Sequence, residues 1–127
     1  MDEQRLSTIR SALRGLNGLS EEIEASAAIS GDGFIIASVL DKSVNAERYG
    51  AMCASLLALA DRAAQEINLG NLRQVVLVGE TGSMLLVQAG PDAVLVVSAR
   101  AALNLGRLFI DAAKVAEKIR SVIEQGY

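Results

Sequence analysis

The segment Gly79-Glu80-Thr81-Gly82-Ser83 is the part of this chain that comes nearest to a nucleotide-binding motif. A phosphate-binding loop needs the pattern G-x-x-x-x-G-K-[ST] and leads into a helix. Here the glycines are closer together, no lysine is present, and the apolar run that follows, Met84-Leu85-Leu86-Val87, has the length of a strand. We therefore expect a hairpin turn at this position and no phosphate site.

Other residues that catalyse reactions or bind metals are scarce. The chain has no histidine, which excludes Ser-His-Asp catalysis, imidazole base chemistry and most transition-metal sites. Asp32 stands in the tight turn Gly31-Asp32-Gly33, where one carboxylate falls short of the several oxygen ligands that calcium requires. Cys53 is the only cysteine and stands in an apolar helical pattern, so we expect a buried thiol without a redox role. The sequence predicts a protein that is not an enzyme, with no catalytic residue, metal or cofactor.

The composition argues against further classes of partner. A net charge of −3, the lack of a basic tract and only 3% aromatic residues argue against nucleic acid. No apolar stretch approaches the roughly 18 residues of a membrane span, and the acidic, amphipathic start differs from a signal peptide, so we expect a cytoplasmic protein with no membrane insertion. The length fits one domain, residues 1–127, and an apolar content of 51% suggests a buried subunit interface.

Three apolar runs of strand length follow one another in the second half of the chain, at residues 75–78, 84–87 and 93–97. The connectors between them are too short to hold a helix, so successive strands must reverse direction and form an antiparallel meander. Each run is almost continuously apolar, which predicts that helices cover both faces of the sheet.

Helices and strands alternate along the whole chain. Hydrophobic periodicity and capping residues predict helices at residues 2–15, 45–68 and 104–124, with Asn45 as the cap of the second helix, and two strands at residues 24–30 and 34–38. We expect one stripe of the second helix to lie on the sheet: Tyr49, Met52, Cys53, Leu56, Leu59, Ala60, Ala63 and Ile67. A stripe of small residues beside it would allow another helix to approach closely. The fold class is α+β, in the order helix, two strands, helix, three strands, helix.

This order, together with Ala27-Ala28-Ile29-Ser30-Gly31-Asp32-Gly33 and Leu103-Asn104-Leu105-Gly106-Arg107-Leu108, resembles the Roadblock/dynein light chain superfamily, in particular its prokaryotic stand-alone domains. The resemblance extends from Leu6 to about Ile123. It implies a five-stranded antiparallel sheet covered by helices on both faces, as in profilin-like domains, and a homodimer formed by the third strand and the second helix of each subunit. The residues that match this interface are Ala51, Ala54, Ser55 and Ala58 on the helix, and Val75, Val76, Leu77 and Val78 on the strand.

The third strand also points to a dimer on physical grounds. An apolar strand at a sheet edge leaves backbone groups unpaired, and pairing across a two-fold axis removes this liability. The alternative is a monomer in which the first helix or a loop covers the edge.

The resemblance also implies an adaptor without chemistry of its own, since several superfamily members bind or regulate Ras-like small GTPases. Arg73, Arg100 and Arg107 are the candidates for contact with a GTPase, because an inserted guanidinium can stabilise phosphoryl transfer; solvated charges at element ends are the alternative interpretation. Another candidate function is a structural scaffold subunit without a nucleotide-dependent partner, and a third is a small-molecule sensor. Dependence of binding on the nucleotide state separates the first two.

Overall fold

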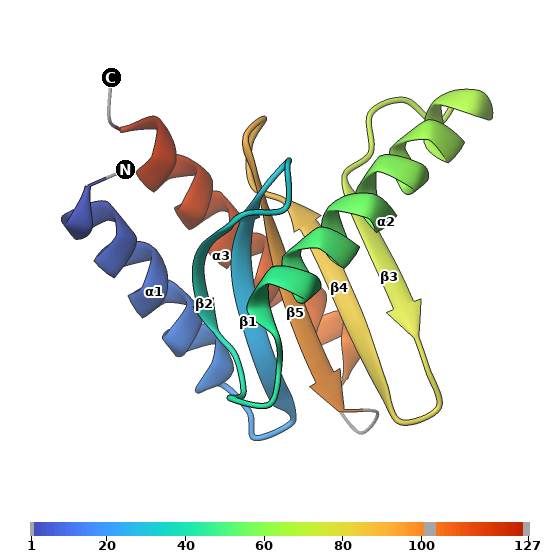
Figure 1. Cartoon of the computed structure of the whole chain (residues 1–127). Helices are drawn as coiled ribbons and strands as arrows, with labels where there is room; N and C mark the ends of the chain where they lie inside the picture. The colour runs from blue at the N-terminus through green and yellow to red at the C-terminus, as the bar shows by residue number, and fades with distance from the viewer. Residues whose placement is uncertain (1, 101–103, 126–127) are drawn as a thin grey trace.

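We describe the protein from a computed structural model, which covers residues 2–100 and 104–125. Five strands form one antiparallel sheet in the order β2-β1-β5-β4-β3 (Figure 1), which confirms the expected fold. The elements in chain order are α1 (Glu3–Asn17), β1 (Ile23–Ser30), β2 (Ile35–Val39), α2 (Ala46–Glu66), β3 (Gln74–Val78), β4 (Gly82–Gln88), β5 (Ala93–Arg100) and α3 (Leu105–Glu124).

Helices lie on both sides of the sheet (Figure 1): α1 and α3 cover one face, and α2 crosses the other. The core on the α1/α3 side is the larger and contains Ile9, Leu13, Leu95, Leu108 and Ile119, all buried. The core under α2 is smaller and includes Cys53, Leu86 and Val96. The α2 side therefore relies on fewer buried side chains.

Each helix begins at a side-chain cap. Asp2, Asn45 and Asn104 accept hydrogen bonds from backbone N–H groups three residues on, at 2.8, 3.0 and 3.1 Å. The prediction of Asn45 as a cap is confirmed. The first helix was expected to end near Gly15 but continues to Asn17, because a glycine in the last turn weakens a helix without ending it.

The prediction that helices cover both faces of the sheet holds for β1, β4 and β5 and is wrong for β3. Val76, Leu77 and Val78 are exposed, with Val78 exposed by 71%. The reason is the placement of the helices. On one face of the sheet, α3 packs on β4 and β5, while α1 packs on β1 and β2, toward the edge opposite β3.

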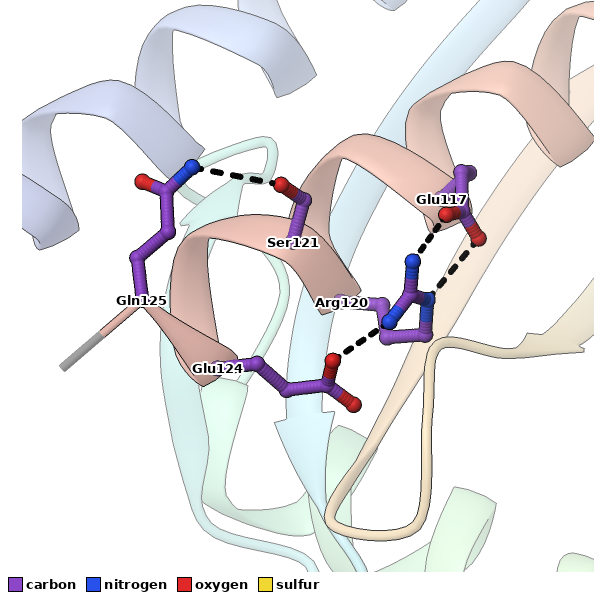
Figure 2. A network of polar contacts seen from close by, with 5 residues as sticks. All are labelled: Glu117, Arg120, Ser121, Glu124 and Gln125. Carbon is purple, nitrogen blue, oxygen red and sulfur yellow. Dashed lines mark hydrogen bonds and ion pairs between the residues drawn. The ribbon is translucent and has the colours of Figure 1, made fainter. Parts of the chain in front are cut away.

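The C-terminal part of α3 is fixed by a network of polar contacts around Arg120 (Figure 2). The Arg120 guanidinium donates from Nε to Glu117 at 2.9 Å and also contacts Glu124, while Gln125 donates to Ser121. The aliphatic stem of Arg120 lies against Gly90 in the β4–β5 turn, where an added Cβ would come within 2.8 Å of the Arg120 Cγ. The network thus positions the end of α3 on this turn.

Acidification is expected to weaken this network. The hydrogen bond from Arg120 holds the pKa of Glu117 below its ordinary value of 4.5, so the stability that Glu117 contributes is present above that value and is lost as the pH falls through the lower, folded-state pKa. We expect Glu117→Gln to flatten part of the fall in melting temperature between neutral and strongly acidic pH. Equal slopes for both proteins would contradict this role. Because the pair is exposed, the effect should be small.

Candidate functional site: an exposed apolar surface on α2 and β3

The largest apolar side chains left exposed between α2 and the sheet edge define what we call the α2/β3 surface. Leu59 is exposed by 66% and Leu77 by 44%. Val75, half-buried, packs into the core beneath α2, which places β3 directly beside that helix. The surface consists of Ala51, Met52, Ser55, Ala58 and Leu59 on α2, and Val76, Leu77 and Val78 on β3.

β3 is an edge strand whose only partner within the described residues is β4. Val75 and Leu77 share the α2 face of the sheet, because alternate residues of a strand point to the same side. Val76 and Val78 lie on the opposite face, where Val76 pairs with Leu85 of the α1/α3 core. Neither α1 nor a loop of the described residues covers these side chains, which contradicts the alternative in which the first helix or a loop protects this edge.

The predicted apolar stripe of α2 is partly wrong. Cys53 is buried and Tyr49 and Leu56 are half-buried as expected, but Met52, Leu59, Ala63 and Ile67 are exposed. At 3.6 residues per turn, Met52 and Leu59 lie about 100–120° around the helix from Cys53, so they flank the buried side. A helical projection centred on Cys53 would have separated Met52 and Leu59 from Tyr49 and Leu56, and thus added Met52 and Leu59 to the site.

The stripe of small residues on α2 is also divided by the structure. Ser55, Ala51 and Ala58 are exposed and free to face a partner helix. Ala54 is half-buried, because the β1–β2 turn of its own chain lies against it: a Cβ added at Gly33 would be 3.1 Å from the Ala54 Cβ. A bulky residue at position 54 would therefore disturb the subunit itself, and Ala58 is the better probe of the surface.

Two glycines set the position of α2 on the sheet. Gly33 has a φ of 91°, which favours glycine, and its carbonyl oxygen would lie 2.2 Å from a Cβ added at Gly50. The backbones of the β1–β2 turn and of α2 are thus in direct contact. Next to this contact, the Tyr49 hydroxyl is 3.2 Å from the Ser98 hydroxyl on β5, and burial raises the pKa of Tyr49. Sequence reasoning assigned Gly33 to a turn and missed Gly50.

The three candidate arginines do not converge. Arg73 precedes β3, and Arg100 ends β5 near the opposite end of the sheet, where its Nε is 2.8 Å from Glu24 Oε1. That hydrogen bond raises the pKa of Arg100. Arg107 belongs to α3, on the other face, and pairs with Asp111 at 3.3 Å. All three side chains are exposed. Arg73 is thus remote from Arg100, whereas Arg100 and Arg107 both lie near residues 19–24: Arg100 N–H donates to the Glu22 carbonyl at 2.8 Å, and Arg107 lines a hollow with Ser20 and Ile23.

The remaining residues considered for chemistry take structural positions. Gly79 donates to the Gly82 carbonyl at 2.8 Å, which confirms the hairpin turn between β3 and β4. Asp32 is exposed on its turn, and no group of three His, Cys, Asp or Glu residues able to hold a metal occurs in residues 2–100 and 104–125. Within the same ranges, no helix is long and apolar enough to cross a membrane.

Cys53 is expected to be unreactive in the folded protein. It is 3% exposed beneath α2, and burial raises the pKa of its thiol, which lowers the thiolate fraction. A disulfide reagent such as dithionitrobenzoate should therefore react with Cys53 only after denaturation. Rapid stoichiometric reaction of the native protein would show instead that α2 opens readily.

Comparison with known sequences gives a consistent result. Residues 12–99 match the Roadblock/LC7 domain family. The uncharacterized Methanocaldococcus jannaschii protein MJ1340 is 42% identical over 103 residues, which are 81% of this chain and 90% of that protein. A second protein of that organism, MJ0310, is 41% identical with the same coverage.

Comparison with solved structures supports the same fold. A structure of MglB in a tetrameric arrangement has a TM-score of 0.89 at 17% identity and covers 100% of this chain and 96% of its own. A Roadblock/LC7 domain from Streptomyces avermitilis has a TM-score of 0.84 at 20% identity, with coverages of 91% and 97%. Acanthamoeba castellanii profilin II has a TM-score of 0.56 at 20% identity, with coverages of 93% and 98%. At these identities the likeness establishes the fold.

Proposed function

We propose that this chain, which belongs to the Roadblock/LC7 domain family, is a cytoplasmic, non-enzymatic homodimeric adaptor that binds and regulates a Ras-like small GTPase. The observation that carries the proposal is the α2/β3 surface, where a strand with an unpaired edge carries exposed valine and leucine side chains. Such an edge is an aggregation hazard unless a specific partner covers it.

A second copy of the chain fits this edge well. In the proposed dimer, the two β3 edges pair antiparallel across a two-fold axis, so that the two sheets become continuous and each unpaired backbone group gains a partner. The α2 helices then face each other through Ala51, Ser55 and Ala58, whose small side chains allow a close approach. Met52 and Leu59 would be buried along the same contact.

The GTPase part of the proposal comes from the family resemblance and from the shortage of catalytic groups in the chain. Because Arg100 and Arg107 are paired with Glu24 and Asp111 of their own chain, we propose that the dimer acts mainly by ordering the catalytic residues of the GTPase itself. Replacing Arg73, Arg100 and Arg107 by alanine one at a time should then leave the stimulation of GTP hydrolysis within a fewfold of the parent. A loss on the order of 10³ for one variant would assign that arginine as a catalytic finger instead.

The proposal is tested with the Ras-like GTPases encoded in the same genome. Each is loaded with GDP or with a non-hydrolysable GTP analogue and mixed with the purified chain, and the mass of the complex is measured by light scattering after size exclusion. We expect a dimer that binds one GTPase preferentially in the GTP form. A dimer that ignores every GTPase in both states would contradict the regulatory role and favour a structural scaffold subunit.

A further inference from the structure

A second surface lies on the other side of the sheet, in a groove between α1 and α3. The groove has a volume of about 440 Å³ and is lined by Ala12, Gly15 and Leu19 on one side and by Lys114, Val115 and Lys118 on the other. Beyond Leu19 it continues into a smaller hollow of about 230 Å³ beside Ile23 and Leu108. Helices α1 and α3 lie on the opposite face from α2 (Figure 1), and none of the residues that line the groove belongs to the α2/β3 surface.

Gly15 is a glycine that the fold of the chain itself does not require. It lies within α1, where glycine is less favourable than alanine, and its φ is not in the left-handed region. A Cβ added there meets nothing within 4 Å. The absent side chain therefore serves no internal contact, and it leaves room for the backbone of another chain to approach α1.

The floor and the rim of the groove differ in character. Leu19 is 59% exposed and, with Val115 and Ala12, makes an apolar floor. Lys114 and Lys118 are exposed on the α3 rim, and among residues 2–100 and 104–125 no carboxylate pairs with either lysine within 4.0 Å. Asp111, the acidic residue that also lines the groove, is already paired with Arg107. The rim is thus positive on a chain whose net charge is negative.

We infer that this groove binds an acidic amphipathic helix of a partner protein. Apolar side chains of that helix would contact Leu19 and Val115, its backbone would approach Gly15, and its carboxylates would pair with Lys114 and Lys118. The lining residues on α3 run from Arg107 to Lys118, a length of about 16 Å, which suits three turns of a helix. The inference is independent of the proposed function, because a scaffold and a GTPase regulator could each use this face.

The probe is a synthetic helical peptide of about 14 residues. Its leucines are spaced three and four residues apart so that they form one apolar stripe, and its glutamates flank that stripe. The control peptide carries lysine in place of every glutamate. Binding is followed by amide chemical shifts of the ¹⁵N-labelled, full-length chain. We expect the acidic peptide to shift the amides of Gly15, Leu19 and residues 114–118, and the lysine peptide to bind at least about tenfold more weakly.

Two variants test the position of the peptide. Gly15→Leu adds a side chain whose Cβ meets no atom within 4 Å, and it should fill the groove and abolish the shifts in a chain that remains folded by circular dichroism. The double variant Lys114→Glu/Lys118→Glu should bind the lysine peptide and no longer bind the acidic peptide. The control Lys42→Glu changes an exposed lysine in the β2–α2 connection and should leave the binding of both peptides as in the parent chain.

Three results of the binding experiments would overturn the inference. The first is equal binding of the acidic and the lysine peptide to the parent chain, and the second is unchanged binding of the acidic peptide to the Gly15→Leu variant. The third is an absence of shifts in the parent chain with the acidic peptide at about millimolar concentration. A lower assembly mass for Gly15→Leu in light scattering would also overturn it, because it would assign the groove to a second copy of this chain.

Discussion

Gly50→Ala is expected to unfold at a melting temperature roughly 10 °C below that of the parent chain. Helix propensity alone predicts the opposite sign, because alanine is the better helix former by about 1 kcal/mol. The reason is steric: the new Cβ would lie 2.2 Å from the Gly33 carbonyl oxygen, which belongs to the backbone of a tight turn. Helix α2 must move away from the sheet, and overpacking of this kind costs about 2–3 kcal/mol.

The matched control for this variant is Gly15→Ala. Both glycines are in helices, but a Cβ at Gly15 meets no atom within 4 Å, so the control should leave stability unchanged or raise it by up to about 1 kcal/mol. Both melting curves are recorded at one protein concentration, since association of subunits shifts the apparent stability. Similar changes in the two variants would disprove the close contact between Gly33 and Gly50.

The second large effect is expected at the sheet edge. Leu77→Asp and Val78→Asp place a charge on each face of β3, at side chains exposed in the single subunit. In a two-fold interface every substitution occurs twice, so each variant would bury two unpaired carboxylates. We expect the dimer dissociation constant to rise by at least about 100-fold, corresponding to about 2.7 kcal/mol. At micromolar concentration the mass from light scattering should fall to that of one chain, with the circular dichroism spectrum retained.

Ile110→Asp is the control for this experiment, because Ile110 is also an exposed apolar residue but belongs to α3. It should leave the dimer mass unchanged. Dimers that persist in both β3 variants would show that the subunits associate through another surface. A parent chain that is monomeric at micromolar concentration would contradict the proposed homodimer directly.

Local patterns in the sequence were sufficient to predict the elements of this fold. Short connectors forced the meander of β3, β4 and β5, and Asn45 marked the start of α2, because turns and caps depend on residues close in the chain. The coverage of β3 could not be predicted in this way. This coverage depends on how far α3 extends across the sheet, and the residues of β3 carry no information about the position of α3.

The candidate site was only partly predictable for the same reason. The small residues on α2 and the valines of β3 were assigned to an interface, and most of them are exposed as an interface requires. Met52 and Leu59 were assigned to the core because they stand three residues after Tyr49 and Leu56, a spacing that joins them to one stripe although they lie about 100–120° around the helix from Cys53. The contact of Gly50 with Gly33 leaves no signal in hydrophobic periodicity, since neither residue has a side chain.

The attachment of α2 has a consequence for how this helix opens in solution. Its first turns are held by the Gly33–Gly50 contact and by Tyr49 with Ser98, whereas Leu59 in the later turns and Ile67, which follows the last turn, are exposed. Amide hydrogen exchange along α2 should therefore show a gradient in an isolated subunit, with strong protection at the start and local fraying toward Glu66. A partner that covers the later turns would remove the gradient, so the exchange rates of α2 report on the occupancy of its outer surface.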